Sequence, residues 1–229
     1  MKKLTLLSVL FSMVVSPAVL AAETGGIAVG ATRVIYNADS REASLAVINH
    51  SGAQYFLIQS WVDDSAGSKK VPFTITPPLF RLNANKENML RIIKSGEGLP
   101  QDRESVYWVN VKAIPPAPEG DGQNTLQLAV KTRIKMFYRP KGLPGNAAET
   151  PKKLEWHQQG DDLVVKNPTA YSASFNNLTV DGKEVKDANL VLPQSEVHYK
   201  LNSAHASKVA YKCINDFGGL TDEISSSVN

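Results

Sequence analysis

The side chains best suited to catalysis or metal binding are scattered through this sequence. The histidines lie in turns or strand-like stretches without the spacing of metal ligands, at His50, His157, His198 and His205. Nucleotide-binding, zinc-protease and serine-hydrolase motifs are all absent. The sequence therefore predicts no enzyme, no catalytic residue, no metal site and no cofactor.

Two adjacent carboxylates and one thiol are the remaining candidates for chemistry. Asp63 and Asp64 end a strand-like stretch, where neighbouring side chains point to opposite faces, so we expect turn residues rather than an acid/base pair. Cys213 is the only cysteine and cannot form a disulfide within the chain. Because it falls inside a strand pattern, we expect a buried and unreactive thiol.

Positively charged side chains are concentrated in one strand-like stretch, NTLQLAVKTRIKMFYRP, residues 124 to 140. One face of this predicted strand carries Leu126, Leu128, Val130, Thr132, Ile134 and Met136, and the other carries Gln127, Ala129, Lys131, Arg133 and Lys135. An ordinary half-buried strand with a solvated back explains this pattern, because every β-sandwich contains such strands. The pattern alone therefore does not establish a function.

Short strands must position this stretch. Six more precede it, separated by turn formers: IAVGATRVIY, EASLAVINH, AQYFLIQSWVDD, KVPFTIT, ENMLRIIK and SVYWVNVKAI. Seven short strands of this kind predict an immunoglobulin-like sandwich for the N-terminal domain, residues 22–140. A linker rich in proline and glycine follows at 141–152, and strand-like segments then resume in a second, smaller β-sandwich, residues 153–229. The predicted fold class is all-β.

The first residues indicate export. Lys2 and Lys3 precede a short apolar run and small residues, which is typical of a signal peptide at residues 1–21, cleaved after Ala21 or alternatively after Ala22. The apolar run is short for a membrane span, so we expect no stable membrane insertion. Cleavage leaves 23 basic and 22 acidic residues, a balance that argues against nucleic-acid partners.

Blocks along the whole mature chain resemble the periplasmic pilus chaperones of the chaperone/usher pathway. They occur in the family's order: GATRVIY, YFLIQSWVDD, TPPLFRL, ENMLRI, LPQDRESVYWVNVKAIP, NTLQLAVKTRIKMFYRP, LVVKNPTAY and INDFGGLT. The resemblance implies two immunoglobulin-like domains in a boomerang arrangement. It also implies pilus subunits and an outer-membrane usher as partners, and a periplasmic location. Because the sequence contains no nucleotide-binding motif, we expect capture and release to proceed without ATP.

The resemblance further implies roles for individual residues. The G1 strand, residues 124 to 139, fills the gap left by a missing strand of the subunit, which is donor-strand complementation, with Leu126, Leu128 and Val130 as donor side chains. Arg33 and Lys135 anchor the subunit's terminal carboxylate. Glu104, Arg139 and Asp216 match an internal salt-bridge network that sets the domain orientation.

Alternatives remain open from the sequence. The donor side chains Leu126, Leu128 and Val130 could instead be core residues of the first domain. The chain could also be a secreted two-domain adhesin or fimbrial subunit, although AETGGIAVG is short for a donor extension, or a hydrolase on a β-sandwich. The short loop PPAPEGDGQ and the lack of a cysteine pair resemble the short-loop subfamily.

Overall fold

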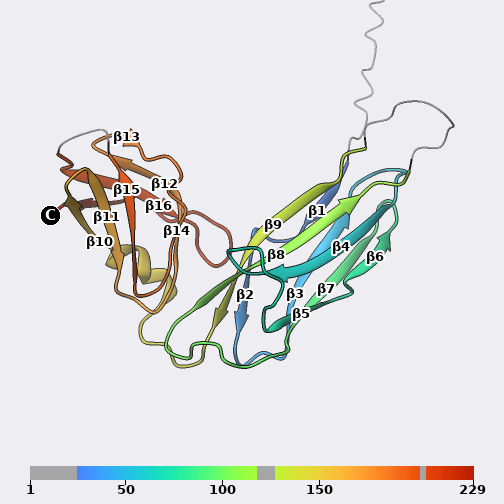
Figure 1. The fold of residues 1–229 in the computed structure, drawn as a ribbon. Helices are drawn as coiled ribbons and strands as arrows, with labels where there is room; N and C mark the ends of the chain where they lie inside the picture. The colour runs from blue at the N-terminus through green and yellow to red at the C-terminus, as the bar shows by residue number, and fades with distance from the viewer. Residues whose placement is uncertain (1–24, 118–126, 202–204) are drawn as a thin grey trace, which may run out of the picture.

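The computed structural model describes residues 25–117, 127–201 and 205–229, and nearly all regular elements in these ranges are β-strands. Figure 1 shows two bodies of strands set at an angle to each other, β1 to β9 in one and β10 to β17 in the other. The predicted all-β fold with two immunoglobulin-like sandwich domains in a boomerang arrangement is confirmed. The predicted signal peptide lies outside the described residues.

Two sheets make up the first domain. One has the order β1-β3-β7-β5 and comprises β1 (Ile27–Val29), β3 (Ala43–Asn49), β7 (Glu87–Lys94) and β5 (Phe73–Thr76). The other has the order β2-β9-β8-β4-β6 and comprises β2 (Arg33–Asn37), β9 (Val130–Arg139), β8 (Ser105–Ile114), β4 (Phe56–Asp63) and β6 (Leu79–Leu82). Neighbouring strands are antiparallel except β2 and β9, which run parallel.

The first predicted strand, residues 27 to 36, is two strands in the structure. β1 pairs with β3 and β2 pairs with β9, so the chain changes sheets near Gly30. A Cβ at Gly30 would lie 2.9 Å from the Cβ of Ala46, which is too close, so glycine permits this approach. The prediction of one continuous strand was wrong, because a glycine inside an apolar run fits an uninterrupted strand equally well.

One short strand of the first domain was not predicted. β6 follows Pro77 and Pro78 and pairs with β4 at the edge of the sheet. Proline indicates a break in regular structure, and four residues give too few alternations to indicate a strand. This edge exposes Leu79, which lies at the opposite side of the sheet from β2.

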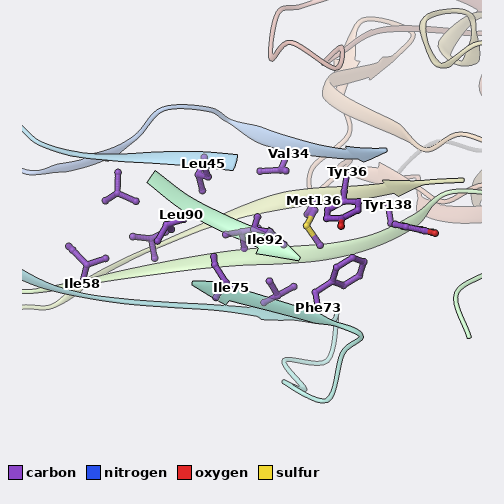
Figure 2. Packing of buried hydrophobic residues seen from close by; sticks show 14 of the residues in the cluster. Val34, Tyr36, Leu45, Ile58, Phe73, Ile75, Leu90, Ile92, Met136 and Tyr138 are labelled. Atoms are coloured by element: carbon purple, nitrogen blue, oxygen red, sulfur yellow. The ribbon is translucent and has the colours of Figure 1, made fainter. Parts of the chain in front are cut away.

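The core of the first domain lies between its two sheets (Figure 2). Side chains from both sheets point into it, including Tyr36 from β2, Ile92 from β7 and Met136 from β9. The Phe73 ring lies 5.5 Å from that of Tyr36 and 5.9 Å from that of Tyr138, centroid to centroid. Each large apolar side chain that is buried contributes about 1.5–3 kcal/mol. This core therefore fixes the C-terminal half of β9 in the first domain.

The second domain is a smaller sandwich. One sheet comprises β10 (Glu155–Gln159), β11 (Asp162–Asn167) and β15 (Ser195–Lys200). The other strands are β12 (Ala173–Val180), β13 (Lys183–Glu184), β14 (Leu190–Val191), β16 (Lys208–Cys213) and β17 (Ile224–Ser227). The sequence did not predict β13, β14 or β17, because two are only two residues long and the third reads ISSS.

An aromatic cluster forms the second core. The ring of Tyr211 lies 5.2 Å from that of Trp156 and 5.5 Å from that of Phe175. Cys213 is buried beside this cluster, as predicted, and burial raises the pKa of its thiol to about 12. At neutral pH the thiol therefore stays protonated and unreactive.

The predicted linker is more regular than its composition indicates. Its second half lies within a short 3-10 helix, η1 (Ala147–Lys153), whose first turn is capped by the Asn146 side chain. Pro151 lies inside the helix, and its carbonyl accepts a hydrogen bond of 2.7 Å from the Tyr211 hydroxyl. This end of the linker is thus packed onto the second domain.

Candidate functional site

The strand β9 has two different edges. Along one edge β8 pairs with it from Val130 to Tyr138. Along the other edge β2 pairs with it only from Lys135 to Arg139. No described strand pairs with this second edge between Val130 and Ile134. Half of β9 therefore presents unpaired backbone N–H and C=O groups, which are a template for another strand.

The strand begins later than predicted. Residues 127 to 129 are described but lie outside the strand, and Leu126 lies outside the described residues. The partner β8 ends at Ile114 and is followed by Pro115 and Pro116, which have no N–H to continue the ladder. The side chain of Gln127 donates hydrogen bonds to both proline carbonyls, at 2.9 and 2.8 Å.

The exposure of side chains changes along this strand. Leu128 and Val130 are 69 % and 65 % exposed, whereas Met136 is fully buried. Ile134, between them, is half-buried against the first core. The alternative that the predicted donor side chains are core residues is therefore wrong for Leu128 and Val130. Two exposed apolar side chains lie beside an unpaired strand edge.

The unpaired edge ends at two cations. Arg33, the first residue of β2, is the register partner of Lys135 in β9. Burial lowers the pKa of Lys135, and the charge of Arg33 lowers it further. No described carboxylate forms an ion pair with either residue. The two positive charges are thus close together and uncompensated by a direct acidic partner.

The Arg33 guanidinium is held but not saturated. Its Nη1 donates a hydrogen bond of 2.8 Å to the Ile214 carbonyl of the second domain, and its Cζ lies 5.5 Å from the centroid of the Phe137 ring. Its Nε is buried and makes no hydrogen bond within the described residues. Burial lowers the pKa of Arg33, while the nearby charge of Asp216 acts in the opposite direction. The guanidinium keeps donor capacity for an incoming acceptor.

Lys135 reaches the second domain by a different contact. Its Nζ donates a hydrogen bond of 2.6 Å to Oδ1 of Asn189. The backbone carbonyl of Asn189 accepts from the Phe175 amide at 2.7 Å, which ties this loop to β12. Sequence reasoning could not identify Asn189 as a partner of Lys135, because the two residues are 54 positions apart and lie in different domains. This amide holds the ammonium in place without neutralising it.

A pocket of about 360 Å³ lies between the domains beside Arg33. Phe137 lines it from the first domain, and Ser174 and Phe217 line it from the second. The Oγ atoms of Ser172 and Ser174 are buried there and make no hydrogen bond within the described residues. The pocket thus combines apolar walls with unused donors.

The three residues of the predicted salt-bridge network lie together. Nε of Arg139 donates to Glu104 at 2.7 Å, and its Nη1 and Nη2 donate to the two carboxylate oxygens of Asp216 at 2.7 and 3.0 Å. The Ser172 amide donates to the other oxygen of Glu104 at 2.8 Å. The network thus joins both domains, because Ser172 and Asp216 belong to the second.

Burial and ion pairing act in opposite directions on the pKa values of Glu104 and Arg139. Burial raises the pKa of Glu104, although the Ser172 amide and Arg139 oppose that shift. Burial alone would lower the pKa of Arg139, but hydrogen bonds and charge from Asp216 and Glu104 outweigh it and raise the pKa. Each charge is satisfied only while the others are in place.

The two adjacent carboxylates have separate structural roles. Asp64 caps a turn, accepting from the amides of Ala66 and Ser68 at 2.9 and 2.8 Å, as predicted. Asp63 was wrongly predicted as a turn residue, because it is buried at the end of β4 and pairs with Arg133 of β9 at 3.0 Å. Sequence spacing cannot show that β4 and β9 are neighbours of β8 on its two sides.

Other candidate groups gather into no metal site. Within residues 25–117, 127–201 and 205–229, His, Cys, Asp and Glu side chains form no group of three or more suited to a metal ion. The helical segments of these ranges include none that is long and apolar enough to cross a membrane.

The sequence and the fold were compared with those of known proteins. A family model for pili and flagellar-assembly chaperones, PapD N-terminal domain, matches residues 26–144, and a model for pili assembly chaperone PapD, C-terminal domain, matches 149–225. The probable fimbrial chaperone LpfB of Escherichia coli O157:H7 is 47 % identical over 232 residues, covering 100 % of this chain and 99 % of that protein.

Another relative and a solved structure also match most of the chain. The chaperone protein FimC of Escherichia coli strain K12 is 43 % identical over 202 residues, covering 87 % of this chain and 83 % of that protein. Among solved structures, a chain in the complex of the SafA pilin with the SafB chaperone of Salmonella enterica is 34 % identical, with a TM-score of 0.82. That match covers 88 % of this chain and 96 % of the other.

Proposed function

Because the chain belongs to the PapD family of pilus-assembly chaperones, which are not enzymes, we propose that it captures pilus subunits by donor-strand complementation. A general role as a chaperone in fimbrial assembly follows from the family itself. The proposal adds the mechanism: the unpaired edge of β9 completes the fold of a subunit that lacks one strand. The proposed domain boundaries remain 22–140 and 153–229, with a linker at 141–152.

One observation carries the proposal. The edge of β9 between Val130 and Ile134 lacks a partner among the described strands and runs directly into Arg33 and Lys135. A strand added there must stop where β2 begins, at Arg33. If the added strand runs parallel to β9, its carboxyl end arrives at the two cations. The edge and the cations are therefore suited to the same ligand, a terminal strand that ends in a carboxylate.

The anchor supplies register and the edge supplies affinity. Arginine offers a planar pair of donors and lysine a point charge, so together they suit a carboxylate in a partly desolvated site. Main-chain hydrogen bonds along β9 place little demand on sequence, while Leu128 and Val130, with Leu126 before them, insert into the subunit's apolar groove. Each inserted side chain contributes about 1.5–3 kcal/mol before ordering costs.

The remaining steps follow from location and chemistry. From the predicted signal peptide and the family we infer that the mature chain acts in the periplasm and delivers the subunit to an outer-membrane usher. The sequence contains no nucleotide-binding motif, so capture and release proceed without ATP. Transfer of a purified subunit to the usher should occur at the same rate with and without added nucleotide.

Charge placed on the donor edge tests the mechanism. The double variant Leu126→Glu/Leu128→Glu should lose subunit capture, measured by copurification from the periplasm and identification by mass spectrometry, because carboxylates cannot enter an apolar groove. The control Leu79→Glu places a carboxylate at the opposite edge of the same sheet and should retain capture.

The folded state must be measured in parallel. Both variants should keep the thermal transition of the unmodified chaperone, because Leu79 and Leu128 are more than half exposed. Normal capture by the double variant, or its unfolding, would overturn the assignment of β9 as the donor strand.

A further inference from the structure

Phe217 is an unusually exposed aromatic residue. Its side chain is 99 % exposed, and it lies in the turn between β16 and β17 of the second domain. The stretch INDFGGLT contains it, but neither the strand pattern nor the salt-bridge network assigns it a role. A single exposed apolar side chain is ordinary, so its setting has to decide whether it has a function.

The turn that carries Phe217 is tightly held. Oδ1 of Asn215 accepts hydrogen bonds from the amides of Phe217 and Gly219, both at 3.0 Å. The Asn215 amide donates to the Gly219 carbonyl at 2.8 Å, and the Gly218 amide donates to the Asn215 carbonyl at 3.0 Å. Gly218 has a φ of +85°, which favours glycine. The ring is therefore displayed from a fixed backbone.

Contacts with the first domain place this turn beside the anchor. A Cβ at Gly218 would lie 2.5 Å from Oγ1 of Thr32, so the turn packs closely against the residue that precedes Arg33. Asp216, the residue before Phe217, makes the bidentate pair with Arg139. The contact with Thr32 thus places the turn beside the start of β2, where the unpaired edge of β9 ends, and the Asp216 pair ties the turn to the C-terminal end of β9.

The pocket beside Phe217 indicates the kind of ligand. Phe217 and Arg33 line it together, with Ile214 and Ser174. Nε of Arg33 and Oγ of Ser174 have no hydrogen-bond partner among the described residues and can donate to an acceptor, whereas the Phe217 ring offers apolar surface. The end of a peptide strand offers both, because it carries carboxylate or carbonyl oxygens beside side chains.

We propose that Phe217 contacts the captured subunit, packing against the last residues of its terminal strand where its carboxylate meets Arg33 and Lys135. This inference rests on the proposed function and deepens it. It adds an apolar contact from the second domain to a site otherwise built from β2 and β9. Because the turn is fixed before binding, packing on the ring costs little ordering entropy, which is typical of an aromatic interface anchor.

Matched variants of the same turn test the inference. The probes are the subunit that copurifies with the unmodified chaperone, identified by mass spectrometry, and a synthetic peptide of its last strand. Phe217→Ala should bind both about ten- to a hundredfold more weakly. Phe217→Tyr keeps the ring and should bind within about twofold of the unmodified protein. Leu220→Ala, an exposed apolar residue of the same turn outside the pocket, should bind normally.

Separate readouts distinguish this inference from the proposed function. Lys135→Ala and an amidated peptide are measured in the same assay. If neither change weakens binding, the proposed anchor fails. If both weaken it and Phe217→Ala binds as tightly as Leu220→Ala, the inference about Phe217 alone fails. Thermal melts of Phe217→Ala and Phe217→Tyr should coincide with that of the unmodified protein, because the Phe217 ring is almost entirely in solvent.

Two other occupants of the Phe217 surface have their own outcomes. Sedimentation of the free chaperone shows whether a second copy covers the ring, in which case Phe217→Ala abolishes self-association and leaves subunit affinity unchanged. Transfer assays with the usher show whether the ring serves that partner, in which case capture is normal and transfer is lost. Either result would overturn the inference.

Discussion

Two groups of cations on β2 and β9 lie at the domain junction, and they differ in whether a carboxylate pairs with them. Arg139, at the end of β9, is paired with Glu104 and with Asp216. Arg33 and Lys135, at the other end of the pairing between β2 and β9, have no ion-pair partner among the described residues. Burial acts on all of them, yet the pKa of Arg139 is raised whereas those of Arg33 and Lys135 are lowered.

This difference distinguishes a structural site from the proposed binding site. The Arg139 network connects the two domains through charges that satisfy one another. The Arg33 and Lys135 pair leaves positive charge uncompensated at the end of an unpaired strand edge, an arrangement that an incoming anion would stabilise. Removing Arg139 should therefore affect folding, whereas removing Arg33 or Lys135 should affect binding.

The largest expected effect is on stability. Arg139→Ala leaves the Glu104 carboxylate, whose side chain is 2 % exposed, without its cation. Breaking a buried pair from one side costs about 3–5 kcal/mol, so the free energy of unfolding should fall by that amount in urea titration. Adding Glu104→Gln should restore part of the loss, because a neutral amide is less costly to bury.

A surface pair provides the control for that measurement. Arg91→Ala removes the contact of 3.8 Å with Glu42, in which both side chains are substantially exposed. Such pairs contribute about 0–1 kcal/mol, so stability should hardly change. If Arg139→Ala is no more destabilising than Arg91→Ala, the network does not stabilise the domain junction.

The second effect is on subunit binding. Arg33→Ala or Lys135→Ala should abolish recovery of subunit from the periplasm, because losing one charge-assisted partner in a desolvated site costs about 2–5 kcal/mol. That loss lowers affinity by a factor of tens to thousands. Lys131→Ala, a change of the same charge at an exposed position on the same face of β9, is the matched control.

A cycle between chaperone and ligand sharpens this prediction. Amidating the terminal carboxylate of a subunit peptide should weaken binding to the unmodified chaperone much more than binding to Arg33→Ala/Lys135→Ala. Equal losses in both backgrounds, measured by calorimetry, would mean that the carboxylate is held elsewhere, and neither residue would then belong to the site.

The sequence predicted part of this contrast. Alternation along residues 124 to 139 correctly separated the face of Met136 from that of Lys135, because a strand has a period of two. Alternation could not show where the strand loses its partner, since that depends on the register of β2 and on Pro115 and Pro116 after β8. The juxtaposition of Arg33 and Lys135 was expected from family resemblance alone.

Contacts between domains were the least accessible to sequence reasoning. The hydrogen bond from Lys135 to Asn189 depends on the angle between two sandwiches, which no local pattern encodes. The pairing of Asp63 with Arg133 likewise depends on strand order rather than spacing. Gly30 shows the same limit, since its crossing between sheets is visible only when Ala46 is placed beside it.

The third effect is the pH dependence of capture. Burial and the charge of Arg33 lower the pKa of Lys135. Its ammonium group therefore loses its proton at a lower pH than that of an ordinary lysine, whose pKa is about 10.4. A bound carboxylate raises that pKa again, and affinity should therefore fall as pH rises through the pKa of the free chaperone. Lys135→Arg, which stays charged, should remove this fall in a titration of affinity against pH.

The smallest expected effect is the stability of the free chaperone after the anchor is neutralised. Lys135→Met removes a hydrogen bond to Asn189, worth about 0.5–1.5 kcal/mol, but it also removes a partly buried charge and its repulsion with Arg33. Because these changes oppose each other, we expect the free energy of unfolding to change by less than about 1 kcal/mol, with an increase at low salt, where repulsion is least screened.

The lowered pKa of Lys135 also predicts how stability depends on pH. The unmodified protein should gain stability as pH rises from the pKa of Lys135 in the folded state towards its pKa in the unfolded state, because over this range the unfolded chain binds more protons. Lys135→Met should lack that gain, in urea titrations at neutral and alkaline pH. A loss of stability comparable to that of Arg139→Ala would show that Lys135 supports the fold as Arg139 does, and the contrast between the two cation sites would not hold.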